Sequence, residues 1–161
     1  MTPEQYNECV DLHADGIYRF ALKNMRDEDV AKDIVQESFA RLWARLDTVD
    51  GKKGKSYLFT TAHHLMADEA KKRKRAPRME EAHENKGFSR QSNPDLKEII
   101  DRALNTLPAI QRSVILLRDL EGYSYDEIAE MTELTMSQVK VYIYRGRTAM
   151  KAYIGKLDLV I

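Results

Sequence analysis

Two stretches of the sequence concentrate side chains that bind phosphate groups and nucleic-acid bases. The stretch KKRKRAPR, residues 71–78, holds six cations in eight positions, although the 26 basic and 26 acidic residues of the chain cancel. Residues 140–151 hold four bases and no acid, whereas residues 119–133 hold six acids and no base. Such basic density suits contacts to a nucleic-acid backbone, but a solvated helix end can carry the same charges.

The second stretch has the chemistry of a helix face that reads DNA bases. At about 100° per residue, Val139, Ile143 and Gly146 fall on one side of a helix that we expect to begin at residue 136. The opposite side and its flanks offer hydroxyl, amide, apolar, aromatic and guanidinium groups, which suit base edges. Lys140, Arg147 and Lys151 suit phosphates instead. The expected DNA-binding residues of this helix are Ser137, Gln138, Lys140, Val141, Tyr144, Arg145, Arg147 and Thr148.

Two capping signatures place this helix in a helix-turn-helix. Ser124 with Glu127, and Thr135 with Gln138, have the spacing of capping boxes, so helices should begin at residues 125 and 136. The first helix is only two turns long and is followed by a short turn. This is the pattern of a unit whose second helix enters the DNA major groove, although a generic helical hairpin with a polar outer face remains an alternative.

The whole chain of 161 residues predicts an all-α fold of two small helical domains. Apolar side chains recur at helical spacing in residues 1–76 and 95–161, whereas residues 77–94 have almost no such periodicity and predict a flexible linker. We expect the second helix to bury Trp43, the third to begin near Tyr57, and the first helix of the second domain to begin at Asn93 and Pro94.

Composition also limits where the protein works. Its one cysteine, Cys9, excludes an internal disulfide and a cysteine-based zinc cluster, and favours a reducing compartment. No apolar run is long enough to span a membrane and no signal-peptide segment is visible, so we expect a cytoplasmic protein without membrane insertion.

Three stretches of the sequence resemble the extracytoplasmic-function (ECF) sigma factors of bacterial RNA polymerase. They are DEDVAKDIVQESFARLW, SYLFTTAHHLMADEAKKRKR and LNTLPAIQRSVILLRDLEGYSYDEIAEMTELTMSQVKVYIYRGRTAMKAYI. The resemblance covers most of both domains in the family's order, with an unlike linker. It implies that residues 1–76 bind core polymerase and the promoter −10 element, and that residues 95–161 read the −35 element. The implied function is promoter-specific transcription initiation without catalysis.

The resemblance also assigns roles within the first domain. The residues implied to dock on the clamp helices of core RNA polymerase are Asp33, Gln36, Glu37 and Arg41. Those implied to contact the −10 element and the DNA backbone are Lys52, Lys53, Lys55, Ser56, Tyr57, His64, Lys71, Lys72, Arg73, Lys74 and Arg75. The loop 52–56 corresponds to a segment that captures a flipped −10 base.

Four positions depart from the family's usual residues. Tyr57 and His64 stand where Trp and Asn are frequent, although Tyr57 can still stack on a base. Val141 and Tyr142 stand where Ser and Arg are frequent. The −35 preference therefore cannot be copied from a relative.

Two other functions deserve comparison. A stand-alone helix-turn-helix regulator would bind operators as a dimer, but the first domain lacks a receiver's strand–helix alternation and no long heptad stripe is visible, so we expect a monomer when the protein is free. An enzyme could use His63, His64, Asp68 and Glu69 as a metal or nuclease cluster, but neither a phosphate loop nor an activated nucleophile accompanies them. We therefore expect no enzymatic activity, no cofactor and no metal. Family members commonly have an anti-sigma partner, but no feature of this sequence identifies a particular one.

Overall fold

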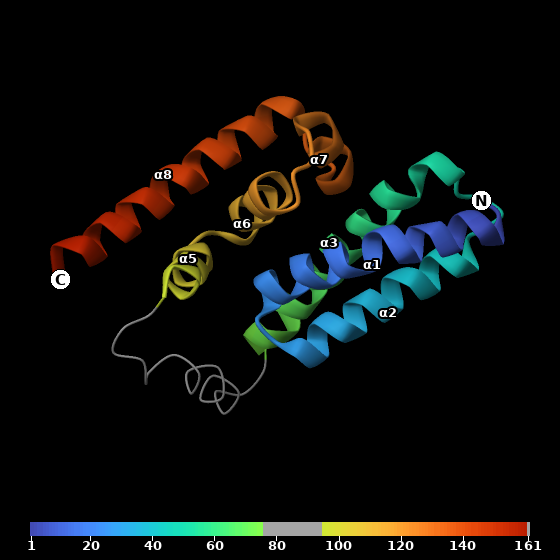
Figure 1. Cartoon of the computed structure of the whole chain (residues 1–161), viewed down its shortest axis with the longest axis horizontal. Helices are drawn as coiled ribbons and strands as arrows, with labels where there is room; N and C mark the ends of the chain where they lie inside the picture. The colour runs from blue at the N-terminus through green and yellow to red at the C-terminus, as the bar shows by residue number, and fades with distance from the viewer. Residues whose placement is uncertain (76–94, 161) are drawn as a thin grey trace.

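The computed structural model describes residues 1–75 and 95–160, and every regular element within them is helical (Figure 1). The elements are α1 (Pro3–Met25), α2 (Glu28–Ala44), the 3₁₀ turn η1 (Gly51–Lys53), α3 (Gly54–Arg75), α5 (Leu96–Asn105), α6 (Ala109–Ile115), the π-helical η3 (Leu116–Leu120), α7 (Tyr125–Thr132) and α8 (Met136–Val160). The prediction of an all-α fold is confirmed, whereas the linker predicted at 77–94 lies outside the described residues.

The N-terminal unit is a bundle of α1, α2 and α3. Phe20, Leu42 and Phe59, one from each helix, are fully buried in its core. The side chain of Thr2 caps α1 in a capping box with Gln5. Asp27 caps α2 by accepting bonds from two backbone N–H groups of its first turn, which satisfies donors that have no partner inside the helix.

The C-terminal unit consists of α5, α6, η3, α7 and α8. Leu117, Ile128 and Val139 are fully buried among these helices. Gly122 has a φ of +78°, a left-handed conformation that glycine adopts at little cost, and it lies in the turn that redirects the chain from η3 to α7.

Three local predictions are wrong. The third helix begins at Gly54 rather than near Tyr57, because the 3₁₀ turn capped by Asp50 continues directly into it. The first helix of the second unit begins at Leu96, capped by Asp95. Trp43 is 54% exposed and packs its ring on the edge of Tyr6, with 5.0 Å between ring centroids.

The two helical units pack against each other. In Figure 1, α7 lies next to the N-terminal part of α3, and the two helices make direct contacts. Ser113 in α6 donates a buried hydrogen bond to Asn24 in α1 over 3.4 Å. One continuous set of buried apolar residues includes members of both units. The two units therefore share one apolar core in this structure.

Candidate nucleic-acid and polymerase interface

The helix-turn-helix is built by the two predicted capping boxes. Glu127 N–H donates to Ser124 Oγ over 3.2 Å, and Ser124 N–H donates to Glu127 Oε1 over 3.1 Å. At α8, Gln138 N–H donates to Thr135 Oγ1 over 3.1 Å, and Thr135 N–H donates to Gln138 Oε1 over 2.9 Å. Both helices start where the sequence predicts, so the turn between them is short.

The outer face of α8 carries all of the predicted recognition residues on the surface. Each of the eight, from Ser137 to Thr148, is exposed, with Tyr144 at 72% and Val141 at 43%. Val139 and Ile143 are buried on the opposite side. Gly146 also lies there, where an added Cβ would come within 2.3 Å of Ile115 Cδ1. Packing on this one side therefore fixes which side chains of α8 face outward.

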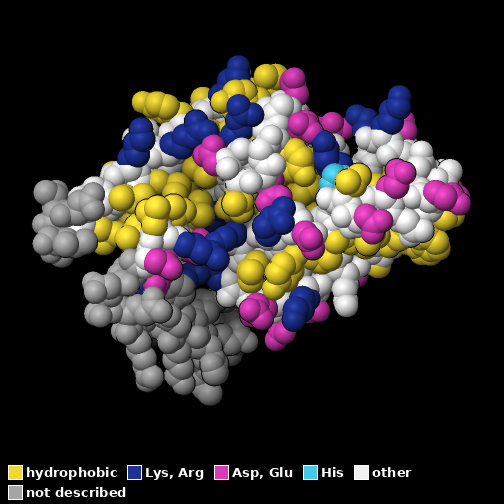
Figure 2. All heavy atoms as spheres, in the orientation of Figure 1, with side chains coloured by type: hydrophobic (Ala, Val, Ile, Leu, Met, Phe, Trp, Pro, Cys, Tyr) yellow, Lys and Arg dark blue, Asp and Glu magenta, His cyan; other side chains and the backbone are white. Residues whose placement is uncertain are grey.

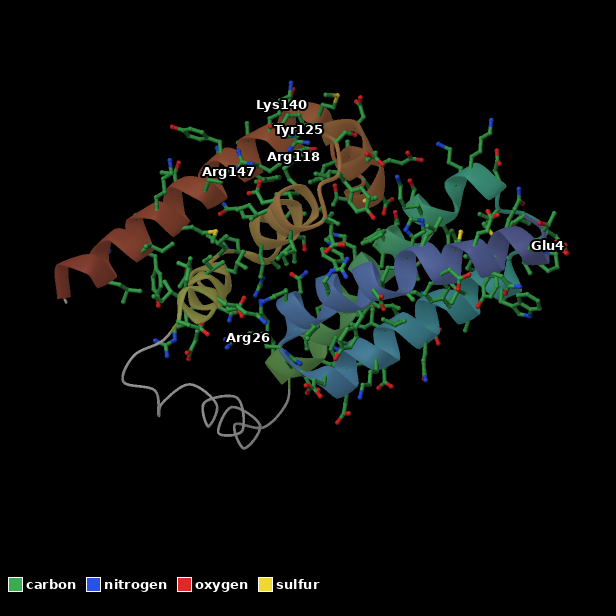
Figure 3. The ribbon with its side chains drawn as sticks, viewed as in Figure 1. Glu4, Arg26, Arg118, Tyr125, Lys140 and Arg147 are labelled. Atoms are coloured by element: carbon green, nitrogen blue, oxygen red, sulfur yellow. The ribbon has the colours of Figure 1, made fainter. Side chains whose placement is uncertain are left out.

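An aromatic ring holds two cations beside the recognition helix (Figure 3). The Arg118 guanidinium lies 4.5 Å from the centroid of the Tyr125 ring, and Lys140 Nζ lies 5.7 Å from it. These distances suit cation–π attraction. Sequence reasoning missed Arg118 and Tyr125, because the ring and its cations come from three different elements.

Arg147 is held by an acid of its own unit. Its Nε donates to Asp119 Oδ2 over 3.1 Å, and its Nη2 donates to Asp119 Oδ1. These hydrogen bonds raise the pKa of Arg147. The pair orients the guanidinium along the flank of α8, which suits a phosphate contact that positions the helix.

Of the predicted −10 residues, Lys52 and Lys53 lie in η1, and Lys55, Ser56, Tyr57 and His64 lie in the first half of α3. A pocket of about 440 Å³ opens there between α2 and α3, and it is lined by Arg41, Ala44, Arg45, Tyr57, Thr60, Thr61 and His64. Its lining combines cations, an aromatic ring and hydroxyl groups. Arg45 and the two threonines were missed by sequence reasoning, because only the packing of α2 on α3 brings them beside Tyr57.

The basic side chains of η1 and of this end of α3 meet two acids of α7 and Glu133, the residue that caps its C-terminal end. Lys53 Nζ lies 2.7 Å from Glu130 Oε1, Lys55 donates to Glu127, and His64 Nε2 lies 2.5 Å from Glu133 Oε1. The hydrogen bond from Lys55 lowers the pKa of Glu127, and that from Lys53 lowers the pKa of Glu130. Both carboxylates are therefore ionised at neutral pH.

The basic run at the end of α3 divides into two kinds of side chain. Lys71, Lys72, Lys74 and Arg75 are exposed. In contrast, Arg73 Nη1 donates to the carbonyl oxygen of Met25 over 2.8 Å, so this residue is directed to the C-terminal end of α1. Four of the five predicted phosphate-binding cations thus lie on the surface, and the fifth has a structural contact.

The predicted polymerase-docking face lies beside this basic run. Asp33, Gln36, Glu37 and Arg41 are all exposed on α2, and Arg41 Nε donates to Glu37 over 2.9 Å. A hollow of about 590 Å³ is lined by Asp33, Glu37 and Arg41 on one side and by Lys71, Lys72 and Arg75 on the other. Acidic and basic predicted contacts thus share one surface of the N-terminal unit.

Comparison with known proteins assigns both helical units to one family of proteins. Residues 9–76 match the family described as "Sigma-70 region 2", and residues 97–150 match "Sigma-70, region 4". The RNA polymerase sigma factor SigV of Bacillus subtilis is 30% identical over 154 residues, which cover 94% of this chain and 92% of that protein. The chain belongs to the sigma-70 family. More specifically, it is a sigma factor of the ECF type and therefore not an enzyme.

Other relatives agree with this assignment. The ECF sigma factor SigE of Mycolicibacterium smegmatis is 28% identical over 160 residues. The match covers 94% of this chain but only 62% of the length of SigE. Two solved structures share the fold. One is the sigma factor RpoE in complex with the anti-sigma factor NepR from Bartonella quintana, with a TM-score of 0.73, 24% identity and coverage of 93% of this chain and 96% of that one. The other is CnrH in complex with the cytosolic domain of CnrY, with a TM-score of 0.70, 23% identity and coverage of 94% and 88%.

Two further observations concern the described part of this sigma factor. Residues 1–75 and 95–160 contain no group of three or more His, Cys, Asp or Glu side chains that could hold a metal ion. Among the same residues, no helix is both long enough and apolar enough to cross a membrane.

Proposed function

We propose that this sigma factor joins core RNA polymerase in the cytoplasm and directs it to promoters through three sets of surface residues. Its region 2-like domain (1–76) docks on polymerase with the outer face of α2 and contacts the −10 element with α3. Its region 4-like domain (95–161) reads the −35 element with α8. The observation that carries the proposal is the exposure of the whole predicted recognition face of α8, backed by buried Val139 and Ile143.

The pocket beside Tyr57 supports binding of an unpaired −10 base. An aromatic ring can stack on a base, and such stacking contributes about 1–3 kcal/mol per base. Arg45, which also lines the pocket, can neutralise an adjacent phosphate. Such a pocket suits a single-stranded nucleotide better than an intact duplex.

In vitro transcription with core RNA polymerase on a library of randomised promoters tests the proposal. We expect transcripts only when the chain is added, with selection of two separated sequence elements. If the chain instead binds one duplex site as a dimer and adds nothing to core polymerase, the stand-alone regulator is the correct function.

An anti-sigma partner is the second part of the proposal. A groove of about 770 Å³ lies over α5, η3 and α8, and its floor is apolar (Figure 2). Leu96, Ile100, Leu120, Met150 and Ile154 contribute to it, and its lining includes five basic residues against two acidic ones. An amphipathic helix with an apolar stripe and acidic flanks fits this chemistry. The solved complex of RpoE with the anti-sigma factor NepR supports the proposal of an anti-sigma partner.

A synthetic helical peptide with a leucine stripe and glutamate flanks can test this groove. We expect Leu120→Asp to weaken its binding at least about tenfold, because a carboxylate would then face the apolar stripe. Leu12→Asp is the matched control, since Leu12 is 73% exposed on α1, outside the groove. Equal affinity of both variants for the peptide would exclude the groove as the docking site.

A further inference from the structure

The hollow of about 590 Å³ between α2 and α3 carries more charge than the proposed docking face of α2 accounts for. Its charged lining from α2 consists of Asp33, Glu37 and Arg41. Five further charged side chains line it from α3, namely Asp68, Glu69, Lys71, Lys72 and Arg75. No surface of the proposed function includes Asp68 or Glu69. Half of the four acids in the hollow thus have no role in that function.

The charges in the hollow are grouped by sign. Arg73 donates to the carbonyl of Met25 and lies 3.9 Å from Asp27, so the C-terminal end of α3 lies beside the N-terminal end of α2, and the two helices run in opposite directions (Figure 1). From this contact, Asp33 lies about 9 Å along α2 and Asp68 lies about 7.5 Å back along α3, at about 1.5 Å per residue. These two acids are therefore nearly level. The hollow has a basic end, with Lys71, Lys72 and Arg75, and an acidic centre, with Asp33, Glu37, Asp68 and Glu69.

Most of these charges have no partner inside the protein. Within residues 1–75 and 95–160, the eight charged side chains of the hollow form a single ion pair, between Glu37 and Arg41 over 2.9 Å. The acids at the centre repel one another, and a basic partner relieves that repulsion. A protein segment that presents basic groups to the centre and acidic groups to the basic end is therefore electrostatically complementary to the hollow.

The lining between the charged groups is apolar. Ile34 is 5% exposed, and Val30 and Leu65 are half-buried. A helix with its side chains is about 10–12 Å wide, and it can pack along the seam between two other helices. An apolar strip with charged borders is the arrangement that receives an amphipathic helix. The occupant should therefore place an apolar side chain on Ile34 and charged side chains on either side of it.

A DNA strand fits this hollow less well than a protein helix. Phosphates carry only negative charge, so the basic end attracts a strand whereas the acidic centre repels it. A protein helix can carry both signs. Asp33 and Glu37, which the proposed function assigns to core RNA polymerase, line the same hollow. The wall formed by α3 is therefore continuous with the proposed polymerase-docking face.

We propose that the α3 wall of this hollow belongs to the core-polymerase interface, and that α2 and α3 together hold one helix of core polymerase. Asp68 and Glu69 pair with basic residues at the middle of that helix. Acidic residues at one of its ends pair with the basic end of the hollow. Lys74 belongs to the same basic run but does not line the hollow, so it remains available to DNA phosphates. This inference rests on the proposed docking of α2, because the continuity of the two surfaces carries it.

The affinity of the full chain for core RNA polymerase, measured without DNA, tests the acidic centre. We expect Asp68→Asn with Glu69→Gln to weaken binding at least about fivefold, because two charge-assisted contacts are lost. Glu8→Gln with Asp11→Asn on α1 is the matched control; it removes two exposed acids outside the hollow and should bind like the parent. Equal affinity of the two variants would overturn the proposal.

The basic end has a matched control within its own run. Lys72→Gln with Arg75→Gln should weaken binding to core polymerase at least about threefold. Lys32→Gln with Lys74→Gln removes two exposed cations that do not line the hollow, and it should leave this affinity unchanged. Unchanged core affinity of the first variant would overturn the proposal. If that variant instead weakened promoter binding by assembled holoenzyme, the basic end would belong to DNA.

Photocrosslinking tests the contact directly. Asp68→p-benzoylphenylalanine should crosslink to core polymerase in the absence of DNA, whereas Lys74→p-benzoylphenylalanine should not; equal crosslinking from both positions would overturn the proposal. Asp33→Ala with Glu37→Ala separates this inference from the proposed function. If that α2 variant binds core polymerase weakly while the α3 variants bind normally, only the inference fails. If the α2 variant binds normally, the proposed docking of α2 fails and the inference fails with it.

Discussion

On α8, some residues are suited to contact DNA bases and others to contact phosphates. Tyr144 and Arg145 lie on the exposed face opposite buried Val139 and Ile143. Arg147 is fixed along the flank by Asp119. Gln138 gives its side-chain oxygen to the cap of Thr135, so its amide NH₂ is the group left for a base. Arg145 is therefore the residue best suited to bidentate contact with a guanine.

We predict that Arg145→Ala relaxes the −35 preference at one or two positions. A bidentate arginine–guanine contact contributes about 1–3 kcal/mol of discrimination, so the variant should lose about that much. Selection of −35 sequences from a randomised pool, with holoenzyme made from each variant, measures the change. Lys151→Ala should lower activity without relaxing preference, because a phosphate contact carries no base information. An unchanged consensus with Arg145→Ala would assign base reading to Gln138, Val141 and Tyr144.

Two half-buried imidazoles make the fold sensitive to acid. Burial lowers the pKa of His63, and the neighbouring His64 lowers it further; burial, then Lys55, lowers the pKa of His13. The unfolded chain takes up these protons near pH 6.5, whereas the folded chain does so only at lower pH. Between those values the unfolded state binds more protons, so the free energy of unfolding falls as pH falls.

We predict a loss of stability on acidification from about pH 7.5 through 6.5, the ordinary pKa of histidine. Each unit by which a folded pKa is lowered corresponds to about 1.4 kcal/mol. Urea unfolding at several pH values and constant salt measures the slope. His13→Gln with His63→Gln should flatten it, and each single variant should remove part of it. A double variant with the parent's slope would place the acid sensitivity elsewhere.

At the scale of elements, α2 has two faces with separate roles. Ile34 and Leu42 are buried against the rest of the N-terminal bundle, whereas Asp33 and Glu37 are exposed. The pairing of Glu37 with Arg41 is an exposed i,i+4 contact, which contributes about 0.3–0.5 kcal/mol to stability. The outer face can therefore be changed with little effect on the fold.

We predict that Asp33→Ala with Glu37→Ala weakens binding to core RNA polymerase at least about tenfold, as expected when two interfacial charges are lost. Helicity and melting temperature should stay near those of the parent. Glu8→Ala with Asp11→Ala on α1 is a control of equal charge, and it should bind core polymerase normally. Retained binding by the α2 variant would place the docking surface on another face.

Local signals account for what the sequence predicted at this scale. The capping boxes at Ser124 and Thr135 each depend on residues three positions apart, so the helix starts at Tyr125 and Met136 were readable. The exposure of Trp43 was not, because apolar periodicity cannot tell a buried aromatic ring from one that covers Tyr6 at the surface. Propensity also gives no sign of the π-helical stretch at 116–120.

At the scale of the whole molecule, the candidate site is a product of long-range packing. The basic residues of η1 and of the start of α3 and their acidic partners in and just after α7 are 69 to 77 positions apart. The sequence showed that residues 119–133 are acidic, but not which surface they face. Arg118 and Arg45 were missed for the same reason, since their partners come from other elements. The sequence predicted which face of a helix each residue occupies, but it did not predict which residues of different helices contact each other.

We predict that the exposed cations of the basic run act on every promoter alike. Replacing Lys71, Lys72 and Lys74 with Gln should weaken holoenzyme binding about equally on all promoters, and it should reduce the slope of log affinity against log salt by roughly 0.9 for each lost duplex contact. Arg73→Gln should mainly lower stability, because Arg73 donates to the end of α1. A salt slope equal to that of the parent would make the run a solvated helix end.

The close approach at Gly146 also restricts how this protein can change by mutation. An added Cβ would lie 2.3 Å from Ile115 Cδ1 and 3.3 Å from Ile115 Cγ1, so even alanine requires the buried end of the Ile115 side chain to move. Every amino acid within one nucleotide change of a glycine codon carries a Cβ. Any replacement of this residue must therefore displace the Ile115 side chain, unless a smaller residue at 115 makes room for it. A new −35 preference can thus arise by substitution on the outer face of α8, while the packing of α8 against α6 is retained.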